Sequence, residues 1–183
     1  MDTMHWDLAK NATRTYILDE VCSNADGMRE FLDDALAEAA LPDKHHHDLP
    51  DVLASIDALN GVSDAVRNDM RAIYQILAEA EARVHGCEVD HTHFHEVGNA
   101  ESIRSVLAIC LAVRHLSPGR ITATPVQVGS GQVECAHGTL DIPAPATAAI
   151  LARGIPVCDE KLEGERCTPT RAAVILHFVD EFV

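Results

Sequence analysis

The sequence predicts a mixed α/β fold of the α+β kind, in which a helix-rich first part is followed by short strands and helices in a single compact domain. The length of 183 residues suits one ordinary domain. Hydrophobic residues make up 47% of the chain but aromatic residues only 4%, so Ala, Leu, Ile and Val must fill the core, which favours helices. From Arg120 onward β-branched residues and glycine-rich turns become frequent, and these indicate strands.

The first 60 residues predict an arm, a short strand and two helices. Residues 1–15 are polar and lack periodicity, so we expect a loosely ordered arm ahead of a single domain over residues 16–183. The chain after the arm begins like a short strand, turns at residues 23–27 and continues as an alanine-rich helix to Leu41, which precedes a proline. A second helix, capped by Asp48, ends at the Asn-Gly pair that follows it.

The clearest helix lies between Ser63, a good N-cap, and Gly86, a typical C-terminal stop. Another helix should begin after Asn99 and run to about His115. The apolar residues of the first of these two helices recur at helical spacing and form one stripe that would pack on the core. They are Val66, Met70, Ile73, Leu77, Ala80 and Val84.

The last third of the chain predicts strands and two more helices. Residues 120–143 alternate apolar and polar positions between glycine-rich turns, which indicates two or three short strands. Helical pattern returns over residues 145–154, and residues 155–167 indicate strand and turn. Thr168 followed by Pro169 is a cap with proline in the first helical position, and predicts a terminal helix.

Charge and cysteine usage exclude several classes of protein. The 29 acidic and 14 basic residues give a formal charge of −15, which would repel a phosphate backbone, so nucleic acid is not an expected partner. Six scattered cysteines without a C-x-x-C pair suit a reducing compartment. The first ten residues contain no apolar signal region, and the longest apolar run, Val106–Val113, is far shorter than the roughly 20 residues of a membrane span. We therefore expect a cytoplasmic protein with no membrane partner.

The strongest chemical signal is the stretch HTHFHE at residues 91–96. In a strand, His91, His93 and His95 would share one face, and three imidazoles on one face can converge on one ion. Glu96 can complete such a site or act as a base on bound water. The alternative is a solvated strand end whose histidines have no common role. Imidazole ligands suit zinc, copper, iron and nickel, so these residue types do not name the metal.

Two further groups of residues have the chemistry of metal ligands. His45, His46 and His47 lie on the predicted loop between two helices, where they could hold an ion loosely and pass it on or simply form a solvated loop. Cys135 and His137 are two residues apart and would share one strand face, either as ligands or as ordinary hairpin residues. Two other histidines have simpler roles: the one at position 85 favours the C-terminal dipole of its helix, and the one at position 177 is expected in the core.

Four motifs in a fixed order resemble a known family. The motifs LAEAEARVHG, HFHEVGNAESI, GSGQVECAHGTLDIPAPAT and CTPTRAA, spread over residues 41–183, are similar to the LarC family of nickel-insertion proteins of lactate racemase maturation. The resemblance implies a lyase-class cyclometallase that inserts nickel into pyridinium-3,5-bisthiocarboxylic acid mononucleotide and gives an organometallic pincer cofactor. It also implies CTP hydrolysis with a divalent ion such as manganese or magnesium.

The resemblance also implies roles for the candidate residues. His93, His95 and Glu96 fall on the most distinctive motif and become the leading nickel-site or catalytic residues, with His91 beside them. The Cys135 and His137 pair matches a second motif and comes next. The histidine loop at residues 45–47 is similar to a shortened nickel-delivery loop of the family.

The resemblance also implies a carboxy-terminal CTP-binding domain, which we expect this chain to lack. We therefore expect a nickel-binding module that works with a second chain carrying that domain, with the mononucleotide as substrate and with further copies of itself in a homo-oligomer. Whether this chain alone is an enzyme stays open.

Two other functions fit the same residues. One is a stand-alone transition-metal binding or storage protein without cofactor chemistry, which is favoured by Glu101, Ser105 and Arg171 because the family usually has other residues at those positions. The other is a metal-dependent hydrolase that uses Glu96 as base on metal-bound water.

Overall fold

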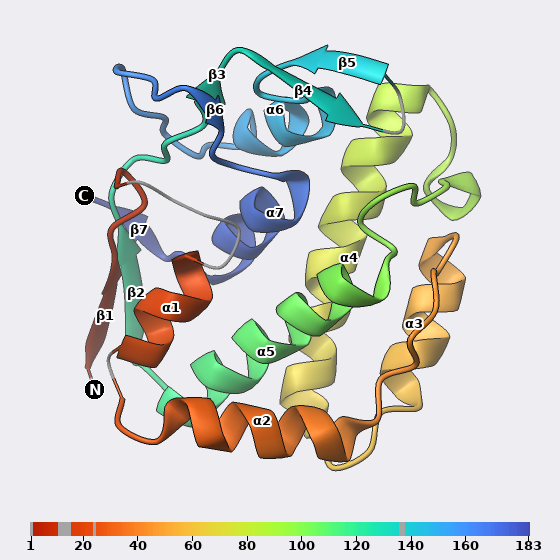
Figure 1. Ribbon diagram of the computed structural model, residues 1–183, viewed down its shortest axis with the longest axis vertical. Helices are drawn as coiled ribbons and strands as arrows, with labels where there is room; N and C mark the ends of the chain where they lie inside the picture. Colours follow the sequence, from red (N-terminus) through yellow and green to blue (C-terminus); the bar gives the residue numbers. More distant parts are fainter. Residues whose placement is uncertain (1, 11–15, 24, 136–137) are drawn as a thin grey trace.

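The computed structural model in Figure 1 describes residues 2–10, 16–23, 25–135 and 138–183 of the protein. Its helices surround a long central helix, and its strands lie along one side and at one end of the molecule (Figure 1), so the predicted mixed α/β fold is confirmed. The helices are α1 (Tyr16–Ser23), α2 (Met28–Ala39), α3 (Leu49–Asp57), α4 (Asp64–His85), α5 (Ala100–Leu116), α6 (Pro145–Leu151) and α7 (Pro169–Phe178), with the short 3-10 helix η1 (Val89–His91). The strands are β1 (Thr3–Trp6), β2 (Arg120–Ala123), β3 (Gly129–Ser130), β4 (Gln132–Cys135), β5 (Gly138–Asp141), β6 (Gly164–Glu165) and β7 (Glu181–Phe182).

Residues 3–6 form strand β1 of the fold, although they fall in the arm expected over residues 1–15; residues 1 and 11–15 of that arm lie outside the described residues. Strand β1 pairs in parallel with β2, and β2 pairs in parallel with β7. Side chains alternate between the two faces of β1, so that Met4 and Trp6 are buried while Thr3 and His5 face outward. Trp6 is fully buried. The strand is only four residues long, and its partner lies more than 100 residues away, so no local pattern reveals it.

The stretch after residue 15 forms helix α1, whereas the sequence predicts a short strand. The β-branched and aromatic residues at its start suggest a strand, but Ile17 and Val21 are four residues apart and both buried. This spacing places them on one helical face, and α1 packs against α5. The packing of α1 on α5 therefore makes this segment a helix, although its local residue propensities favour a strand.

Helix α4 is the centre of the fold and contacts α3, α5, α6 and α7. Its predicted ends are confirmed, because Ser63 Oγ accepts a hydrogen bond from the Val66 amide and Gly86 adopts the left-handed conformation, with φ of 65°, that ends the helix. Five of the six residues predicted for its apolar stripe are buried, and Val84 is the exception at 40% exposure. Because four helices pack against α4, the position of α4 in the fold is fixed. The chain that follows its C-terminal end therefore starts from a fixed point.

The predicted caps at Asp48, Asn99 and Thr168 are also confirmed, since each side chain accepts a backbone hydrogen bond at the start of α3, α5 and α7 respectively. The hairpin of β4 and β5 lies at the top of Figure 1, on the side of the C-terminal end of α4. Within the described residues, no helix is long and apolar enough to cross a membrane.

Arg67 of α4 satisfies the carbonyl groups at the end of α3. Its Nη1 donates to the carbonyls of Ile56 and Asp57 at 2.6 and 3.2 Å, and its Nη2 donates to the Leu59 carbonyl at 2.7 Å. We expect Arg67→Met to lower the free energy of unfolding by about 2 kcal/mol, because charge-assisted hydrogen bonds are lost from a partly buried site. Urea denaturation measures this change.

The matched control is Arg71→Met, one turn further along α4. Arg71 forms an exposed ion pair with Asp57, and removal of an exposed pair should cost less than about 1 kcal/mol. Equal losses in the two variants would show that Arg67 does not cap α3.

Candidate functional site

The histidine-rich stretch at residues 91–96 does not form the strand in which its three histidines would share a face, because His91 ends η1 and residues 92–96 form a loop. The chain leaves η1 at His91 and makes no strand ladder before α5. The predicted alternation persists up to residue 95, because Thr92 and Phe94 are buried while the three histidines around them are exposed. The Phe94 ring lies 6.0 Å from the ring of Tyr74 on α4, between ring centroids, and Tyr74 Oη donates to the Val97 carbonyl at 3.0 Å. Packing on α4 therefore holds the loop in its extended form.

The two histidine segments of the sequence meet in space. The Phe94 amide donates to the His47 carbonyl at 2.7 Å, and the His46 amide donates to the Gly98 carbonyl at 2.8 Å. His45 Nε2 lies 2.8 Å from the Phe94 carbonyl oxygen. A Cβ atom on Gly98 would lie 2.0 Å from the His46 carbonyl oxygen, so only glycine permits this approach.

The three consecutive histidines have different environments. His46 is fully buried, and its Nε2 lies 2.7 Å from Ser55 Oγ while its Nδ1 lies 3.3 Å from the Gly98 carbonyl oxygen. Burial lowers the pKa of His46. A metal ion at His46 would have to displace one of these two partners. His45 is half-buried and His47 exposed, with ring centroids 5.0 Å apart.

The other predicted ligands are dispersed. His91 Nδ1 lies 3.8 Å from Glu88 Oε2, and the His95 ring faces the His85 ring at the end of α4 with centroids 6.4 Å apart. Cys135 Sγ lies 3.3 Å from the Gly138 carbonyl oxygen, and His137 lies outside the described residues. In the part of the chain that the structure describes, no three His, Cys, Asp or Glu side chains are grouped so as to hold a metal ion.

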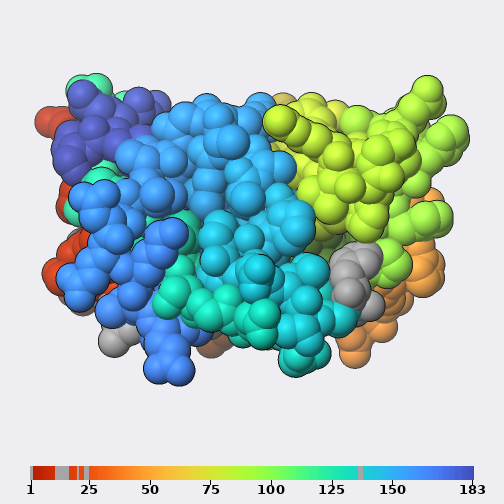
Figure 2. All heavy atoms as spheres, turned by 90° about the horizontal axis from the view of Figure 1, so that it is seen from above, coloured from red at the N-terminus to blue at the C-terminus, as the bar shows by residue number. Residues whose placement is uncertain are grey.

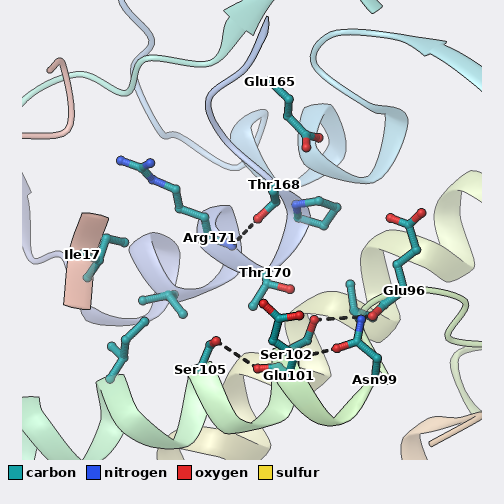
Figure 3. A pocket seen from close by; sticks show the side chains of 14 residues that line it. Ile17, Glu96, Asn99, Glu101, Ser102, Ser105, Glu165, Thr168, Thr170 and Arg171 are labelled. Carbon is teal, nitrogen blue, oxygen red and sulfur yellow. Dashed lines mark hydrogen bonds between the residues drawn. The ribbon is translucent and has the colours of Figure 1, made fainter. Parts of the chain in front are cut away.

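A cavity of about 350 Å³ lies beside the histidine loop, between the beginnings of α5 and α7 (Figure 3). Two of the motifs noted in the sequence, HFHEVGNAESI and CTPTRAA, supply most of its wall although they are separated by more than 60 residues. Helix α1 adds an apolar wall through Ile17. The lining residues are Ile17, Glu96, Val97, Asn99, Glu101, Ser102, Ser105, Ile109, Glu165, Thr168, Pro169, Thr170, Arg171 and Val174.

Local hydrogen bonds fix the cavity wall. Asn99 Oδ1 accepts from the Ser102 amide at 2.7 Å, and Thr168 Oγ1 accepts from the Arg171 amide at 3.3 Å, so both N-caps lie at the cavity. Ser105 Oγ donates to the Glu101 carbonyl at 2.9 Å. The amino-terminal ends of two helices therefore open onto the same space, where their dipoles favour negative charge.

The charged side chains of the cavity are mainly acidic. Glu96, Glu101 and Glu165 line it together with one cation, Arg171. In Figure 3 the Glu101 and Glu165 carboxylates face the cavity from opposite sides. The Arg171 side chain is buried, and its Nη1 donates to the Arg166 carbonyl at 3.0 Å. Carboxylates in this arrangement can accept protons or attract a cation.

The cysteine of the CTPTRAA motif does not provide a reactive thiolate. Burial raises the pKa of Cys167 to about 12, so this thiol stays protonated near neutral pH. Chemistry at the cavity must therefore use its carboxylates, hydroxyls and backbone groups.

The sequence alone does not reveal most of the cavity residues. Asn99 and Thr168 are predicted as helix caps, and Glu96 as a ligand or base, but nothing in the sequence places them around one space. One feature of the sequence could have indicated the site. Both N-caps lie within family motifs at the start of a helix, and two such helix starts are candidates for a shared binding site.

Comparisons with known proteins agree with the motif resemblance and extend it. The family described as nickel insertion protein matches residues 9–183, which is nearly the whole chain. Relatives whose names include nickel insertion protein come from Geotalea uraniireducens, with 43% identity over 80% of this chain and 36% of the relative, and from Pelobacter propionicus, with 46% identity over 67% of this chain and 32% of the relative.

A relative from Clostridium kluyveri is named pyridinium-3,5-bisthiocarboxylic acid mononucleotide nickel insertion protein, and it is 43% identical over 66% of this chain and 30% of its own length. No solved structure matches the chain. The chain spans about a third of the length of the curated relatives it matches. It belongs to the nickel insertion protein family.

Proposed function

We propose that this chain is the nickel-binding and substrate-binding module of a nickel insertion protein, acting in the synthesis of a nickel-pincer cofactor. The observation that carries the proposal is that Glu96 belongs both to the histidine-rich loop and to the wall of the cavity between α5 and α7. The histidines that we propose as nickel ligands are thus adjacent in sequence to a residue that lines a ligand-sized space. The substrate we assign to the cavity is the mononucleotide in the name of the Clostridium kluyveri relative.

The cavity has features that suit this substrate. Its volume of about 350 Å³ lies within the range of small-molecule sites. The carboxylates of Glu101 and Glu165 favour the positively charged pyridinium ring and the nickel ion, and Ile17 and Val174 offer apolar surface to the ring. The amino-terminal ends of α5 and α7 favour the phosphate or thiocarboxylate groups.

We assign the role of base to Glu96. An organometallic product contains a nickel–carbon bond, so the ring carbon that bonds to nickel must give up its proton. Glu96 directly follows His95 in the sequence, and it lines the cavity. In the proposed step the nickel–carbon bond forms, the carbon–hydrogen bond breaks and the proton passes to the Glu96 carboxylate.

CTP and its manganese or magnesium ion are assigned to a nucleotide-binding part outside this chain. The cavity has room for about one mononucleotide, so a second nucleotide would need another site. This part would be supplied by the second chain that the sequence predicts, and the histidine residues 45, 47, 91, 93 and 95 would bind nickel on the present chain.

Substrate binding is tested by calorimetric titration of the full chain with the mononucleotide. Ser105 lines the cavity from α5 and is exposed to it. Ser105→Leu should weaken binding about tenfold or more, because the larger side chain occupies ligand space. Ser105→Ala is the matched control at the same position, and it should bind the mononucleotide within about threefold of wild type, a change below 1 kcal/mol.

The two alternative functions, metal storage and hydrolysis, predict different results for the same proteins. If wild type binds nickel but not the mononucleotide, the chain is a metal-binding or storage protein. If all three proteins bind the mononucleotide equally, the cavity is not the substrate site. Hydrolysis of a phosphoester by the nickel-loaded or zinc-loaded chain would favour the hydrolase.

A further inference from the structure

The C-terminal end of α4 presents a histidine pair that the sequence does not predict. His85, in the last turn of α4, and His95, in the extended loop, face each other with ring centroids 6.4 Å apart and ring planes at 63°. Both residues are exposed. The yellow-green segment that contains them forms one corner of the face seen in Figure 2. An ion in solution therefore has access to this pair.

A carboxylate orients one of the two imidazoles. Glu81 lies one turn before His85 on the same helix face, and its Oε2 is 3.4 Å from His85 Nε2. The Glu81 side chain is 15% exposed, whereas that of His85 is 37% exposed, so the carboxylate lies beneath the ring. When Nε2 carries the proton that faces Glu81, Nδ1 of His85 keeps its lone pair for a metal ion. A carboxylate behind a histidine ligand is the usual arrangement of metal sites.

The local electrostatics favour a cation at this position. The last carbonyl groups of α4 carry about half a unit of negative charge. Glu81 and Glu88 add carboxylates on either side of His85 along the chain. A divalent cation therefore gains both from the helix dipole and from the nearby acidic side chains.

The separation of the rings fits two ligands on opposite sides of one ion. A metal–nitrogen bond to imidazole is about 2.0–2.1 Å, and the ring centroid lies about 1 Å beyond the nitrogen. Two imidazoles on opposite sides of an ion thus have centroids about 6 Å apart, close to the 6.4 Å between His85 and His95. The two rings lie edge to face, so one of these exposed rings must rotate about its χ2 bond to direct a nitrogen at the ion. Square-planar and octahedral nickel both place ligands opposite each other.

We propose that His85 and His95 form a nickel docking site, with Glu81 as a positioning residue and water as the remaining ligands. A docking site that releases its ion needs only two protein ligands, because water fills the remaining coordination positions. In the described residues no third His, Cys, Asp or Glu side chain joins a metal-binding group. The identity of the cargo as nickel rests on the proposed function. The site gives neighbouring residues of one loop two different roles. His95 lies beside α4 and binds nickel, whereas the next residue, Glu96, lines the cavity and accepts the proton.

The test measures nickel affinity of the full chain by competition with a chromophoric chelator. His85→Ala and His95→Ala should each weaken nickel binding about tenfold or more, equivalent to about 1.4 kcal/mol. The double variant should lose less than the sum of the two losses, because both side chains bind one ion. The matched control is His115→Ala, since His115 is also an exposed histidine in the last turn of a helix, α5, but packs on Phe31 instead of on a second histidine, and it should stay within about twofold of wild type.

Two further measurements separate ligand loss from misfolding. His85→Gln keeps a polar side chain of similar length but lacks the imidazole, and it should lose nickel affinity as His85→Ala does while keeping the far-ultraviolet circular dichroism of wild type. Glu81→Gln should bind nickel more weakly and shift the visible ligand-field absorption of the bound nickel, which a merely structural role of Glu81 would leave unchanged.

Wild-type affinity in His85→Ala would overturn the proposal, and so would equal losses in His85→Ala and His115→Ala, which would indicate adventitious binding to exposed histidines. These outcomes concern nickel alone. Binding of the mononucleotide to the cavity is a separate titration, so failure of the docking site and failure of the proposed function can be told apart.

Discussion

Arg114→Met is expected to lower the free energy of unfolding by about 3 kcal/mol, because it leaves a buried carboxylate without its main counter-ion. Asp69 of α4 is only 3% exposed. Arg114 of α5 donates to both of its oxygens, with Nε–Oδ2 at 2.6 Å and Nη2–Oδ1 at 2.7 Å, and His177 Nε2 of α7 lies 2.9 Å from Oδ1. One carboxylate thus joins three helices. Methionine keeps most of the apolar stem of arginine, so the loss reports the charge.

The matched control is Arg153→Met, since Arg153, two residues after the end of α6, pairs with Glu79 of α4 at 3.1 Å with both side chains nearly half exposed. Urea denaturation measures both losses, and this variant should lose less than about 1 kcal/mol. A loss of similar size in both variants would mean that Asp69 is hydrated rather than buried in solution.

The pH dependence of the Arg114→Met loss provides an independent check. Burial raises the pKa of Asp69, but hydrogen bonds from His177 and Arg114 outweigh burial and hold the pKa below its usual value. A lowered pKa in the folded state stabilises the protein above the unfolded pKa of about 3.9, and this contribution is lost as pH falls through the folded pKa. The difference in stability between wild type and Arg114→Met should therefore be full at pH 7 and shrink below about pH 4. A difference that stays constant with pH would contradict the assignment to Asp69.

Sequence reasoning succeeds for the capped helices α3, α4, α5 and α7, but not for α1, because capping signals are local. Ser63 and Gly86 bound α4 as predicted, and Asn99 and Thr168 cap their helices, since capping depends only on residues within one turn. Strand β1 has no such signal. Its four residues are a strand only because β2 lies beside them, and that pairing joins residues more than 100 positions apart.

The site shows the same division between local and long-range information. The run of three histidines at residues 45–47 is uniform in sequence, yet His46 is buried against Ser55 and Gly98 while His47 is exposed. The histidine spacing at residues 91–95 correctly gives alternate burial, because an extended chain alternates its side chains with or without a ladder. It does not reveal that His95 lies beside His85, because α4 and the loop are brought together by tertiary contacts such as the packing of Phe94 on Tyr74.

Gly98→Ala is expected to lower the free energy of unfolding by about 3 kcal/mol, the upper end of the usual cost of overpacking. The new Cβ would lie 2.0 Å from the His46 carbonyl oxygen and 2.9 Å from Phe94 Cβ. Backbone cannot yield as a flexible side chain does, so the two histidine segments must separate. The hydrogen bond from the His46 amide to the Gly98 carbonyl would lengthen or break. Urea denaturation measures the loss of stability.

Gly119→Ala is the matched control, because Gly119 also has no left-handed φ and its nearest neighbour, the Asp2 carbonyl oxygen, would be 3.0 Å from the new Cβ. Its loss should be about 1 kcal/mol or less, since a small shift of one terminal segment relieves the contact. The functional consequence should also differ. Glu96 and Asn99 flank Gly98 and line the cavity, so Gly98→Ala should weaken mononucleotide binding about tenfold while Gly119→Ala leaves it unchanged. If Gly98→Ala lost stability but bound the mononucleotide as wild type does, the loop would hold the fold together without shaping the cavity, and the substrate site would have to be sought elsewhere on the chain.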